Sequence, residues 1–477
     1  MKTKLFFTIC LFVISTISIA QNPELWGMTQ SGGANSRGAI FKINGDGTGF
    51  SLQYSFINTG SSGQPKGNLF QANDGKFYGM NQLSGSAGKG QLFRFNPSTN
   101  VYSPLIDFVG PNGASPTASV MQATNGKLYG MAPLGGTGGF YQWGDIFSFS
   151  IPDSQFVDLY NFSCTSTVDG GEPFGNLIQA TNGKLYGMTS FGGINSSGVI
   201  FSFDIPTSTC TKVFDLNSAL GEEPLGSLIQ ANNGKLYGMT SRGGANNFGV
   251  IFSFDFSSGS YTKLLDFNNA NGKSPHGSLI QATNGKLYGM TQRGGSDSVG
   301  VIFTFDISSN TYAKLYDFDT TNGKWPNGSL MQASNGKLYG MTGYGGSNNY
   351  GVVFSFDPTT NNFTNLFSCN YPTGAIPNGD LTEYNPTVGI NEISNSTIDL
   401  NVFPNPFSSE TILKVNKNLK DATLIIYNLF GQETKRLTAI SGSELKIKRE
   451  NLSIGIYFIR LSDESKVIAT SKLIITN

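Results

Sequence analysis

The sequence has few of the residues on which most catalytic and metal sites depend. Histidine occurs once among 477 residues, as His276, and charged residues make up only 13% of the chain. One histidine excludes multi-histidine metal sites and restricts a nucleophile–base arrangement to His276. Because 31 basic residues balance 31 acidic ones, the charge does not indicate nucleic acid as a partner. We therefore predict no metal site, no cofactor and no nucleic-acid binding.

Long hydrophobic runs are also scarce, and the clearest one lies in the first twenty residues. Two lysines precede an apolar run from Leu5 to Ile17, and a small-x-small pattern ends at Ala20. This order is typical of a secretory signal peptide over residues 1–20. The run is shorter than the about 20 residues that a membrane span needs, so we expect no transmembrane segment.

Glycine and aromatic residues, by contrast, are abundant. Glycine accounts for 61 of the 477 residues, about 13%, and aromatic residues for 12%. The usual share of glycine is roughly 7%. Many glycines together with many aromatic side chains indicate an all-β protein that is rich in turns.

A tetrapeptide, Leu-Tyr-Gly-Met or a close variant, recurs seven times. Successive copies are 51 residues apart, except for one interval of 52 and one of 57. So regular a period indicates one supersecondary unit per copy, close in length to the blade of a kelch-type propeller. The seven methionines are Met28, Met80, Met131, Met188, Met239, Met290 and Met341.

Each unit reads as four antiparallel strands, and the unit from Gly277 to Phe318 serves as the example. Runs rich in Val, Ile, Tyr and Phe alternate there with turn residues. The dipeptide Asn284-Gly285 predicts a two-residue type I′ hairpin between the first two strands. Seven such units predict a seven-bladed β-propeller over residues 21–386. The expected strands of the example are Ser278–Ala282, Lys286–Thr291, Val301–Asp306 and Tyr312–Phe318.

The ends of the repeat array predict how the ring closes. The mature chain begins at a second strand, Leu25–Met28, and an unpartnered first strand follows the last unit at Gly379–Tyr384. The C-terminal strand can therefore complete the N-terminal blade, which removes exposed sheet edges. An open solenoid with capped ends is the alternative.

The repeat segments resemble known families. The motif Phe356-Asp357-Pro358, with Phe363 following, is similar to the kelch pattern. The recurring segments Gly-Lys-Leu-Tyr-Gly-Met-Thr and Gly-Val-Ile-Phe-Ser-Phe-Asp, along Leu25–Tyr384, more closely resemble the GloVer tandem repeats of exported bacterial proteins. This resemblance implies a propeller and no particular reaction.

The composition changes after the repeats. Residues 387–396 form a polar linker, and residues 397–477 carry 11 basic against 8 acidic residues, which supports a domain boundary. Short strands are expected at Ala422–Tyr427, Ile456–Leu461 and Lys472–Ile475, which predicts a small Ig-like β-sandwich.

The tail contains four further motifs, at Phe403–Phe407, Ile426–Gln432, Gly455–Ile459 and Lys472–Ile475. Together they resemble the type A sorting domain of the type IX secretion system. That resemblance implies a bacterium of the Bacteroidota, passage through the periplasm, and a secreted or outer-membrane-surface location reached with the type IX machinery. The alternative is that the tail is an ordinary Ig-like adhesion domain. The residues that carry the resemblance include Pro404, Asn405, Pro406, Gly431, Gly455, Tyr457 and Lys472.

Candidate binding residues lie in the loops of one face. In propellers the loops joining the second and third strands, and those joining one blade to the next, share a face. Tyr141, Trp143 and Trp325 fall in such loops, where aromatic rings could stack on sugars or anchor a protein. The alternative is that these side chains cover hydrophobic seams between blades.

The same loops contain carboxylates that could serve acid–base chemistry. Glu172, Glu222 and Glu223 lie at neighbouring blade junctions, and glycoside hydrolysis needs a pair of carboxylic acids. Exposed loop carboxylates are usually only solvated, so these residues are weak catalytic candidates. The segment Asp317–Gly323 has the wrong glycine position and lacks the distal Glu of a calcium loop. His276 reads as an ordinary loop residue.

The sequence thus predicts a monomeric secreted or surface propeller that binds a polysaccharide or a surface protein. An extracellular carbohydrate-active enzyme and a structural or adhesin component without catalysis are the alternatives.

Overall fold

A computed structural model describes residues 22–57, 63–137, 142–164, 169–386, 400–428, 433–450, 452–463 and 466–476. The expected signal peptide and linker lie outside these residues. The chain divides into two compact units between Asn385 and Pro386.

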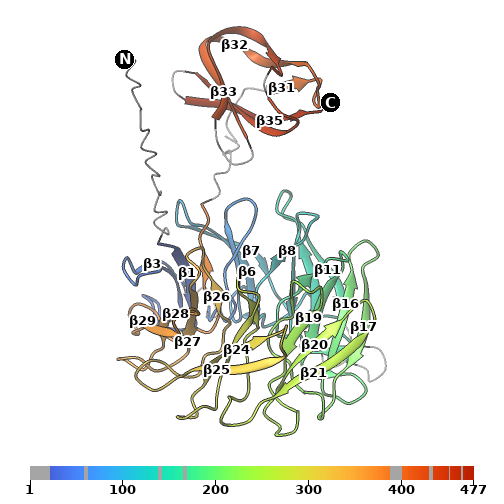
Figure 1. Ribbon diagram of the computed structural model, residues 1–477, viewed down its shortest axis with the longest axis vertical. Helices are drawn as coiled ribbons and strands as arrows, with labels where there is room; N and C mark the ends of the chain where they lie inside the picture. Colours follow the sequence, from blue (N-terminus) through green and yellow to red (C-terminus); the bar gives the residue numbers. More distant parts are fainter. Residues whose placement is uncertain are drawn as a thin grey trace, which may run out of the picture. The chain divides into compact units, whose positions relative to one another are not determined.

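The described part of the first unit contains seven four-stranded antiparallel sheets, here numbered in chain order and visible in Figure 1. Sheet 1 holds β1 (Glu24–Thr29), β2 (Ala39–Asn44), β3 (Ser51–Ser55) and β30 (Thr382–Glu383). Sheet 2 holds β4 (Phe70–Gln71), β5 (Phe77–Asn81), β6 (Gln91–Asn96) and β7 (Val101–Asp107). Sheet 3 holds β8 (Met121–Gln122), β9 (Leu128–Ala132), β10 (Asp145–Phe149) and β11 (Phe156–Asn161).

The remaining four sheets repeat the same order. Sheet 4 holds β13 (Ile178–Gln179), β14 (Leu185–Thr189), β16 (Val199–Asp204) and β17 (Thr209–Asp215), and sheet 5 holds β18 (Ile229–Gln230), β19 (Leu236–Met239), β20 (Val250–Asp255) and β21 (Ser260–Asp266). Sheet 6 holds β22 (Ile280–Gln281), β23 (Leu287–Thr291), β24 (Val301–Asp306) and β25 (Thr311–Asp317), and sheet 7 holds β26 (Met331–Gln332), β27 (Leu338–Thr342), β28 (Val352–Asp357) and β29 (Asn362–Ser368). A short ribbon pairs β12 (Gly170–Gly171) with β15 (Phe191–Gly192).

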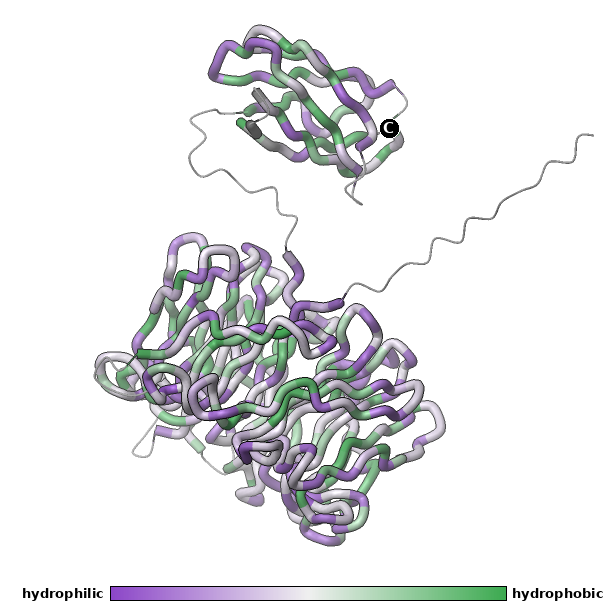
Figure 2. Tube along the Cα trace, turned by 90° about the vertical axis from the view of Figure 1, so that its left-hand side faces the viewer, coloured by the Kyte–Doolittle hydropathy of each residue, from purple (hydrophilic) through white to green (hydrophobic). Residues whose placement is uncertain are grey.

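Each sheet packs face to face against the next one. Second and third strands such as β23 and β24 are buried almost throughout, as expected for strands covered on both faces, and the hydrophobic stretches lie inside the unit in Figure 2. One cluster joins Met290 and Ile302 of sheet 6 to Leu338 and Phe354 of sheet 7. Equivalent clusters join each of the other consecutive pairs of sheets.

The last sheet packs against the first, so the seven sheets form a closed ring. Leu25 and Leu381 of sheet 1 share a cluster with Tyr339 and Met341 of sheet 7. Strand β30 pairs with β1, and the Tyr384 N–H donates to the Glu24 carbonyl at 2.8 Å. The surplus strand expected at Gly379–Tyr384 thus covers the free edge of the N-terminal sheet.

The glycine of the recurring tetrapeptide is required by close packing. A Cβ on Gly289 would lie 2.6 Å from the ring carbon Cζ of Phe303 on the neighbouring strand. Even an alanine would therefore displace a buried aromatic ring.

The Asn-Gly hairpin differs from the expected type I′ turn. Gly285 is left-handed at φ +80°, while Asn284 is not among the left-handed residues. The Gly285 N–H donates to the Ala282 carbonyl and the Ala282 N–H to the Lys286 carbonyl, which is a type I turn followed by a glycine bulge. The Asn284 carboxamide supports this turn, because its Oδ1 accepts the Lys286 N–H and its Nδ2 donates to the Tyr288 hydroxyl.

The described part of the second unit forms one five-stranded sheet. It consists of β31 (Leu400–Phe403), β32 (Glu410–Tyr427), β34 (Gly455–Asp463) and β35 (Lys466–Ile475), with β33 (Glu433–Lys448) paired to β32. These strands are longer than the sequence pattern predicts, and irregularities interrupt the pairing of β32 with β33. Within the residues that the structure describes, no helix has the length and hydrophobicity of a membrane span.

Candidate functional site

Seven equivalent segments enter the first strands of the sheets and meet at the centre of the ring. Each has the pattern x-Pro-x-Gly, with alanine replacing the glycine once. We call them the entry segments. They are residues 64–68, 115–119, 172–176, 223–227, 274–278, 325–329 and 376–380.

Hydrogen bonds link each entry segment to the next. The Asn176 N–H donates to Ser227 Oγ at 2.7 Å, and the Ser227 N–H donates to Ser278 Oγ at 2.8 Å. The Ser278 N–H continues the series to Ser329 Oγ at 2.8 Å, and the Ser329 N–H donates to the Asp380 carboxylate. The entry segments are thus fixed by contacts between units that lie 51 residues apart.

The glycines let neighbouring entry segments abut. A Cβ on Gly277 would lie 2.2 Å from the Gly328 carbonyl oxygen, and one on Gly328 would lie 2.2 Å from that of Gly379. This close approach of backbones leaves only a small space at the centre.

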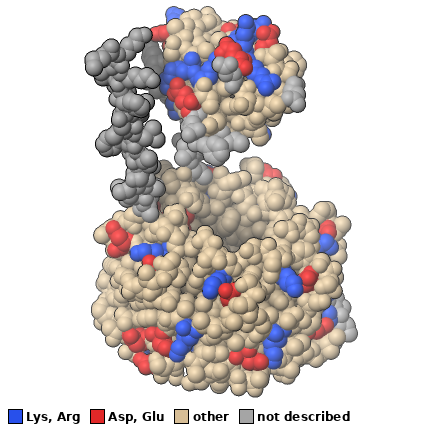
Figure 3. All heavy atoms as spheres, in the orientation of Figure 1, with Lys and Arg blue, Asp and Glu red and all other residues tan. Residues whose placement is uncertain are grey.

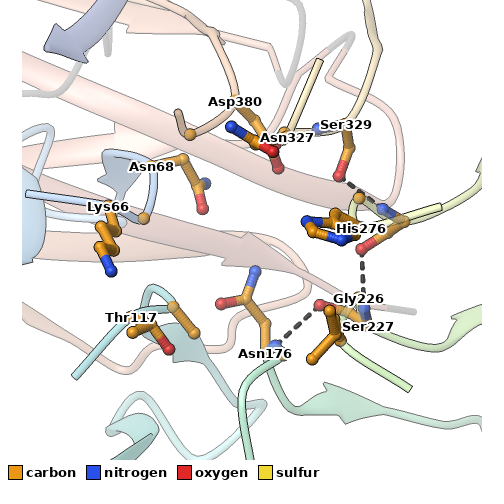
Figure 4. A pocket seen from close by; sticks show the side chains of 18 of the residues that line it. Lys66, Asn68, Thr117, Asn176, Gly226, Ser227, His276, Asn327, Ser329 and Asp380 are labelled. Atoms are coloured by element: carbon orange, nitrogen blue, oxygen red, sulfur yellow. Dashed lines mark hydrogen bonds between the residues drawn. The ribbon is translucent and has the colours of Figure 1, made fainter. Parts of the chain in front are cut away.

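That space is a pocket of about 80 Å³ lined by the entry segments (Figure 4). A water position needs roughly 10–15 Å³ on this measure, so the pocket has room for a ligand group of a few heavy atoms. The residue after each proline lines the pocket, and its identity varies around the ring. These residues are Lys66, Thr117, Phe174, Leu225, His276, Asn327 and Asn378.

A relay of side chains spans one side of this central pocket. Gln292 Nε2 donates both to His276 Nδ1 at 3.1 Å and to Asn327 Oδ1 at 2.7 Å. Asn327 Nδ2 donates to Asn378 Oδ1 at 2.7 Å, and Asn378 donates to Gln30. Burial, assisted by nearby Arg293, lowers the pKa of His276 to about 4. The imidazole is therefore neutral near pH 7 and serves in hydrogen bonding.

Two chargeable groups line the same pocket. Lys66 is half-buried, and burial lowers its pKa. Burial also raises the pKa of Asp380, whose carboxylate accepts the Ser329 N–H. On the side of the first unit that Figure 3 shows, charged side chains are few and lie in small groups that contain both signs.

The residue before each proline has a strained backbone. All seven are left-handed although none is glycine, with φ between 51° and 58°. This region is disfavoured for L-residues, most of all for β-branched and bulky ones such as Ile376 and Trp325. Such strain persists only where the surroundings fix it and is frequent at functional sites. The seven residues are Gln64, Ser115, Glu172, Glu223, Ser274, Trp325 and Ile376.

The candidate catalytic glutamates separate into different environments. Glu172 is half-buried, and its burial together with the nearby Glu223 carboxylate raises its pKa. Glu223 forms an ion pair with Arg242 at 3.1 Å. Glu222 contributes backbone hydrogen bonds to Arg242. The structure therefore brings Glu172 and Glu223 into electrostatic contact.

The candidate aromatic residues are partly buried. Trp143 packs against the cluster between sheets 3 and 4, and its ring stacks on Phe191 with centroids 5.5 Å apart. Phe191 is 42% exposed. Trp325 contacts Tyr344 edge-on at 5.3 Å. Tyr141 lies outside the described residues.

The carboxylates of the segment Asp317–Gly323, which was compared with a calcium loop, form contacts within the protein. Asp317 pairs with Lys314 at 2.8 Å, and Asp319 accepts the Thr321 and Asn322 N–H groups. These bonds stabilise a turn.

In the second unit the sorting-motif residues support the last strand. Asn405 Nδ2 donates to the Lys472 carbonyl at 2.8 Å, and Asn405 Oδ1 accepts the Ile474 N–H at 2.8 Å. The Pro404 carbonyl accepts the Thr411 hydroxyl, and Gly455 begins β34. The Tyr457 hydroxyl donates to the Ser453 carbonyl at 3.0 Å. Pro406 follows Asn405, and Gly431 lies outside the described residues.

The central pocket is not among the sites that the sequence predicted. The polar residues of the pocket and of its relay were not candidates; they include Lys66, Gln292, Asn327, Asn378 and Asp380. For Lys66, Asn327 and Asn378 a signal exists, because aligning the seven units shows that the residue after each proline varies within an otherwise constant segment. Only the ring brings those positions together.

These features define an all-β protein built from tandem four-stranded units and followed by a small β unit. The chain belongs to the Gloeobacter/Verrucomicrobia repeat family, which matches residues 14–140, 137–270 and 221–392. The secretion system C-terminal sorting domain matches residues 401–476. Both predicted resemblances are confirmed. The type IX sorting domain indicates export to the cell surface or beyond it.

Solved structures resemble this chain over about three quarters of its length. Candidate 6-phosphogluconolactonases from Bacteroides fragilis and Bacteroides uniformis match with TM-scores of 0.51 and 0.53 at 17% and 15% identity. The matches cover 76% of this chain and 97% and 99% of those chains. A protein from Lactobacillus plantarum matches with a TM-score of 0.52 at 11% identity, over 76% of this chain and 100% of that one. At these identities the likeness shows the fold alone. A comparison with curated protein sequences gives no match.

Proposed function

We propose that the ring is a seven-bladed β-propeller that binds glycans on the surface of the cell or outside it. In this proposal residues 1–20 are a signal peptide, residues 21–386 the propeller, residues 387–396 a linker and residues 397–477 an Ig-like sorting domain. Closure of the ring by β30 and the seven intersheet clusters support the propeller. The sorting domain supports delivery by the type IX machinery.

The observation that carries the binding function is the variation around the central pocket. The seven entry segments share their proline and, in six of seven units, their glycine. The residues after the prolines are nevertheless of six different types in seven units, and the scaffold does not require this variety. Because these positions meet at one pocket, their variation gives each side of the pocket its own chemistry.

The chemistry of the pocket suits a ligand rich in hydroxyl groups. Asn327, Asn378 and His276 offer hydrogen bonds on one side, and Phe174 and Leu225 offer an apolar wall. Sugar units present hydroxyl groups together with an apolar ring face. Trp143 and Phe191, in loops that share a face with the entry segments, would extend contact along a longer glycan by stacking.

One observation favours a second candidate, an extracellular enzyme acting on carbohydrate. Glu172 has a raised pKa and lies near Glu223, and such a pair could supply a general acid and its partner carboxylate. The pairing of Glu223 with Arg242 makes the binding function the better supported of the two. A purely structural spacer would need neither group.

The test is a glycan array with the full chain, combined with reducing-end assays on the glycans that bind. Asn327→Ala removes the middle of the side-chain relay and should weaken binding at least tenfold. Asn362→Ala is the matched control, because Asn362 is an exposed residue at the start of β29, beside the turn that follows β28 at the opposite face. Turnover that is lost in Glu172→Gln would favour the enzyme, and absence of binding to any glycan would refute the proposal.

A further inference from the structure

On the side of the central pocket that the side-chain relay spans, several hydrogen-bond donors have no acceptor among the described residues. The amide oxygens of the two asparagines already accept bonds: Asn327 Oδ1 from Gln292, and Asn378 Oδ1 from Asn327. Because His276 Nδ1 accepts from Gln292, the neutral ring carries its hydrogen on Nε2. Asn327 and Asn378 each retain a second N–H as well.

The serines of the entry segments add further donors. Ser227 Oγ and Ser278 Oγ each accept a backbone N–H from the preceding segment. Their own hydroxyl hydrogens are consequently available to an acceptor. Both serines line the pocket.

Lys66 supplies a positive charge. Its side chain is half-buried, and among the described residues no acid forms an ion pair with its ammonium group and no side chain accepts a hydrogen bond from it. Removing an ammonium group from water without a partner is costly. An anionic ligand would supply the missing partner.

Among the described residues, Asp380 is the one carboxylate that lines the pocket, and it already accepts a hydrogen bond. It accepts the Ser329 N–H, and its burial favours the protonated form. In that form it would be another donor. Among the described side chains of the relay and the two serines, hydrogen-bond donors therefore outnumber free acceptors.

We propose that the central pocket binds the carboxylate of an acidic sugar, with Lys66 as its counter-ion and the relay donors around it. This inference rests on the proposed glycan binding and names the glycan class. The volume of about 80 Å³ suits one charged terminal group better than a run of sugar rings. A sulfate or phosphate ester would offer related oxyanion chemistry and is distinguished by the test.

The experiment measures binding of the full chain by calorimetry to three probes. They are an oligogalacturonide, the same oligosaccharide with its carboxyl groups reduced to alcohols, and a sulfated oligosaccharide of similar length. We expect the acidic probe to bind at least tenfold more tightly than the reduced and the sulfated probes. Lys66→Met should abolish the preference over the reduced probe, and Lys66→Arg should keep most of it.

The matched control is Lys337→Met, which makes the same change of charge at an exposed turn on the opposite face. Melting temperatures of both variants verify folding. Equal binding of acidic and reduced probes would overturn the inference while leaving glycan binding intact, as would tighter binding of the sulfated probe. Failure of all three probes, with other glycans bound on the array, would overturn the inference; failure of every glycan would overturn the proposed function too.

Discussion

Asp145 of sheet 3 allows a quantitative test of how the repeated units are built. In sheet 5 the equivalent positions are a buried Thr–Val pair: Thr240 Oγ1 accepts the Val250 N–H at 3.2 Å and donates to the Arg242 carbonyl at 2.8 Å. Sheets 4 and 7 have the same pair. In sheet 3 Ala132 and Asp145 replace it.

The Asp145 carboxylate fills the space that the threonine hydroxyl and a valine methyl fill elsewhere. A Cβ on Gly221 would lie 2.5 Å from Thr240 Oγ1 and 2.8 Å from Val250 Cγ2, and one on Gly113 would lie 2.9 Å from each Asp145 oxygen. Asp145 is 0% exposed. Its Oδ1 accepts the Ala132 N–H at 3.2 Å, but among the described residues Oδ2 has no partner.

The double variant A132T/D145V should therefore stabilise the protein. An unsatisfied buried polar group costs about 1–3 kcal/mol, so we expect the free energy of unfolding to rise by about that amount at pH 7. Burial, and then the Asp158 carboxylate, raise the pKa of Asp145 well above its ordinary 3.8. The folded state thus retains a proton that the unfolded state releases, and wild-type stability falls as the pH rises above about 4. The increase in the free energy of unfolding of the double variant over the wild type should be smallest at pH 4 and grow toward pH 7.

The assay is guanidinium denaturation followed by tryptophan fluorescence at pH 4, 5.5 and 7. The reverse change, T240A/V250D in sheet 5, is the control and should destabilise the protein most at pH 7. No gain at pH 7, or the same gain at pH 4, would show that the reasoning about Asp145 is wrong.

Three further predictions concern closure, strain and the pocket. Leu381→Ala should lower the free energy of unfolding, measured by chemical denaturation, by about 2–5 kcal/mol, as much as Leu279→Ala inside the ring. A negligible loss for Leu381→Ala alone would mean that β30 does not close the ring. Ser274→Gly should leave the melting temperature unchanged or raise it. Glycine removes about 1–2 kcal/mol of left-handed backbone strain, while its larger loss of conformational entropy on folding costs about 0.5–1 kcal/mol. A clear drop in the melting temperature would contradict this reasoning. Binding of a neutral glycan should be constant from pH 6 to 8, because the pKa of His276 is about 4; a midpoint near pH 6.5 in calorimetric titrations would instead indicate an ordinary surface histidine.

Much of the fold follows from local pattern. Strand β24 begins and ends where its alternation of Val, Ile and Phe predicts, at Val301 and Asp306. The first strand of that unit is shorter than expected, Ile280–Gln281, because its neighbouring residues bond to adjacent units. The predicted hairpin type was wrong because three residues, 283–285, and not two, separate the paired ends of the strands. A three-residue loop takes a type I turn followed by a glycine bulge.

The sequence by itself determined the repeated units, the matching incomplete ends, the all-β class and the sorting tail. Period, alternation and motif are properties of neighbours along the chain, and they can be read without coordinates. Tertiary structure alone decided where a ligand group would fit. Lys66, His276 and Asn378 belong to entry segments far apart in sequence, and they share a pocket only because seven sheets close into a ring. Their hydrogen-bond partners, and so their protonation and their free donors, are consequences of that closure.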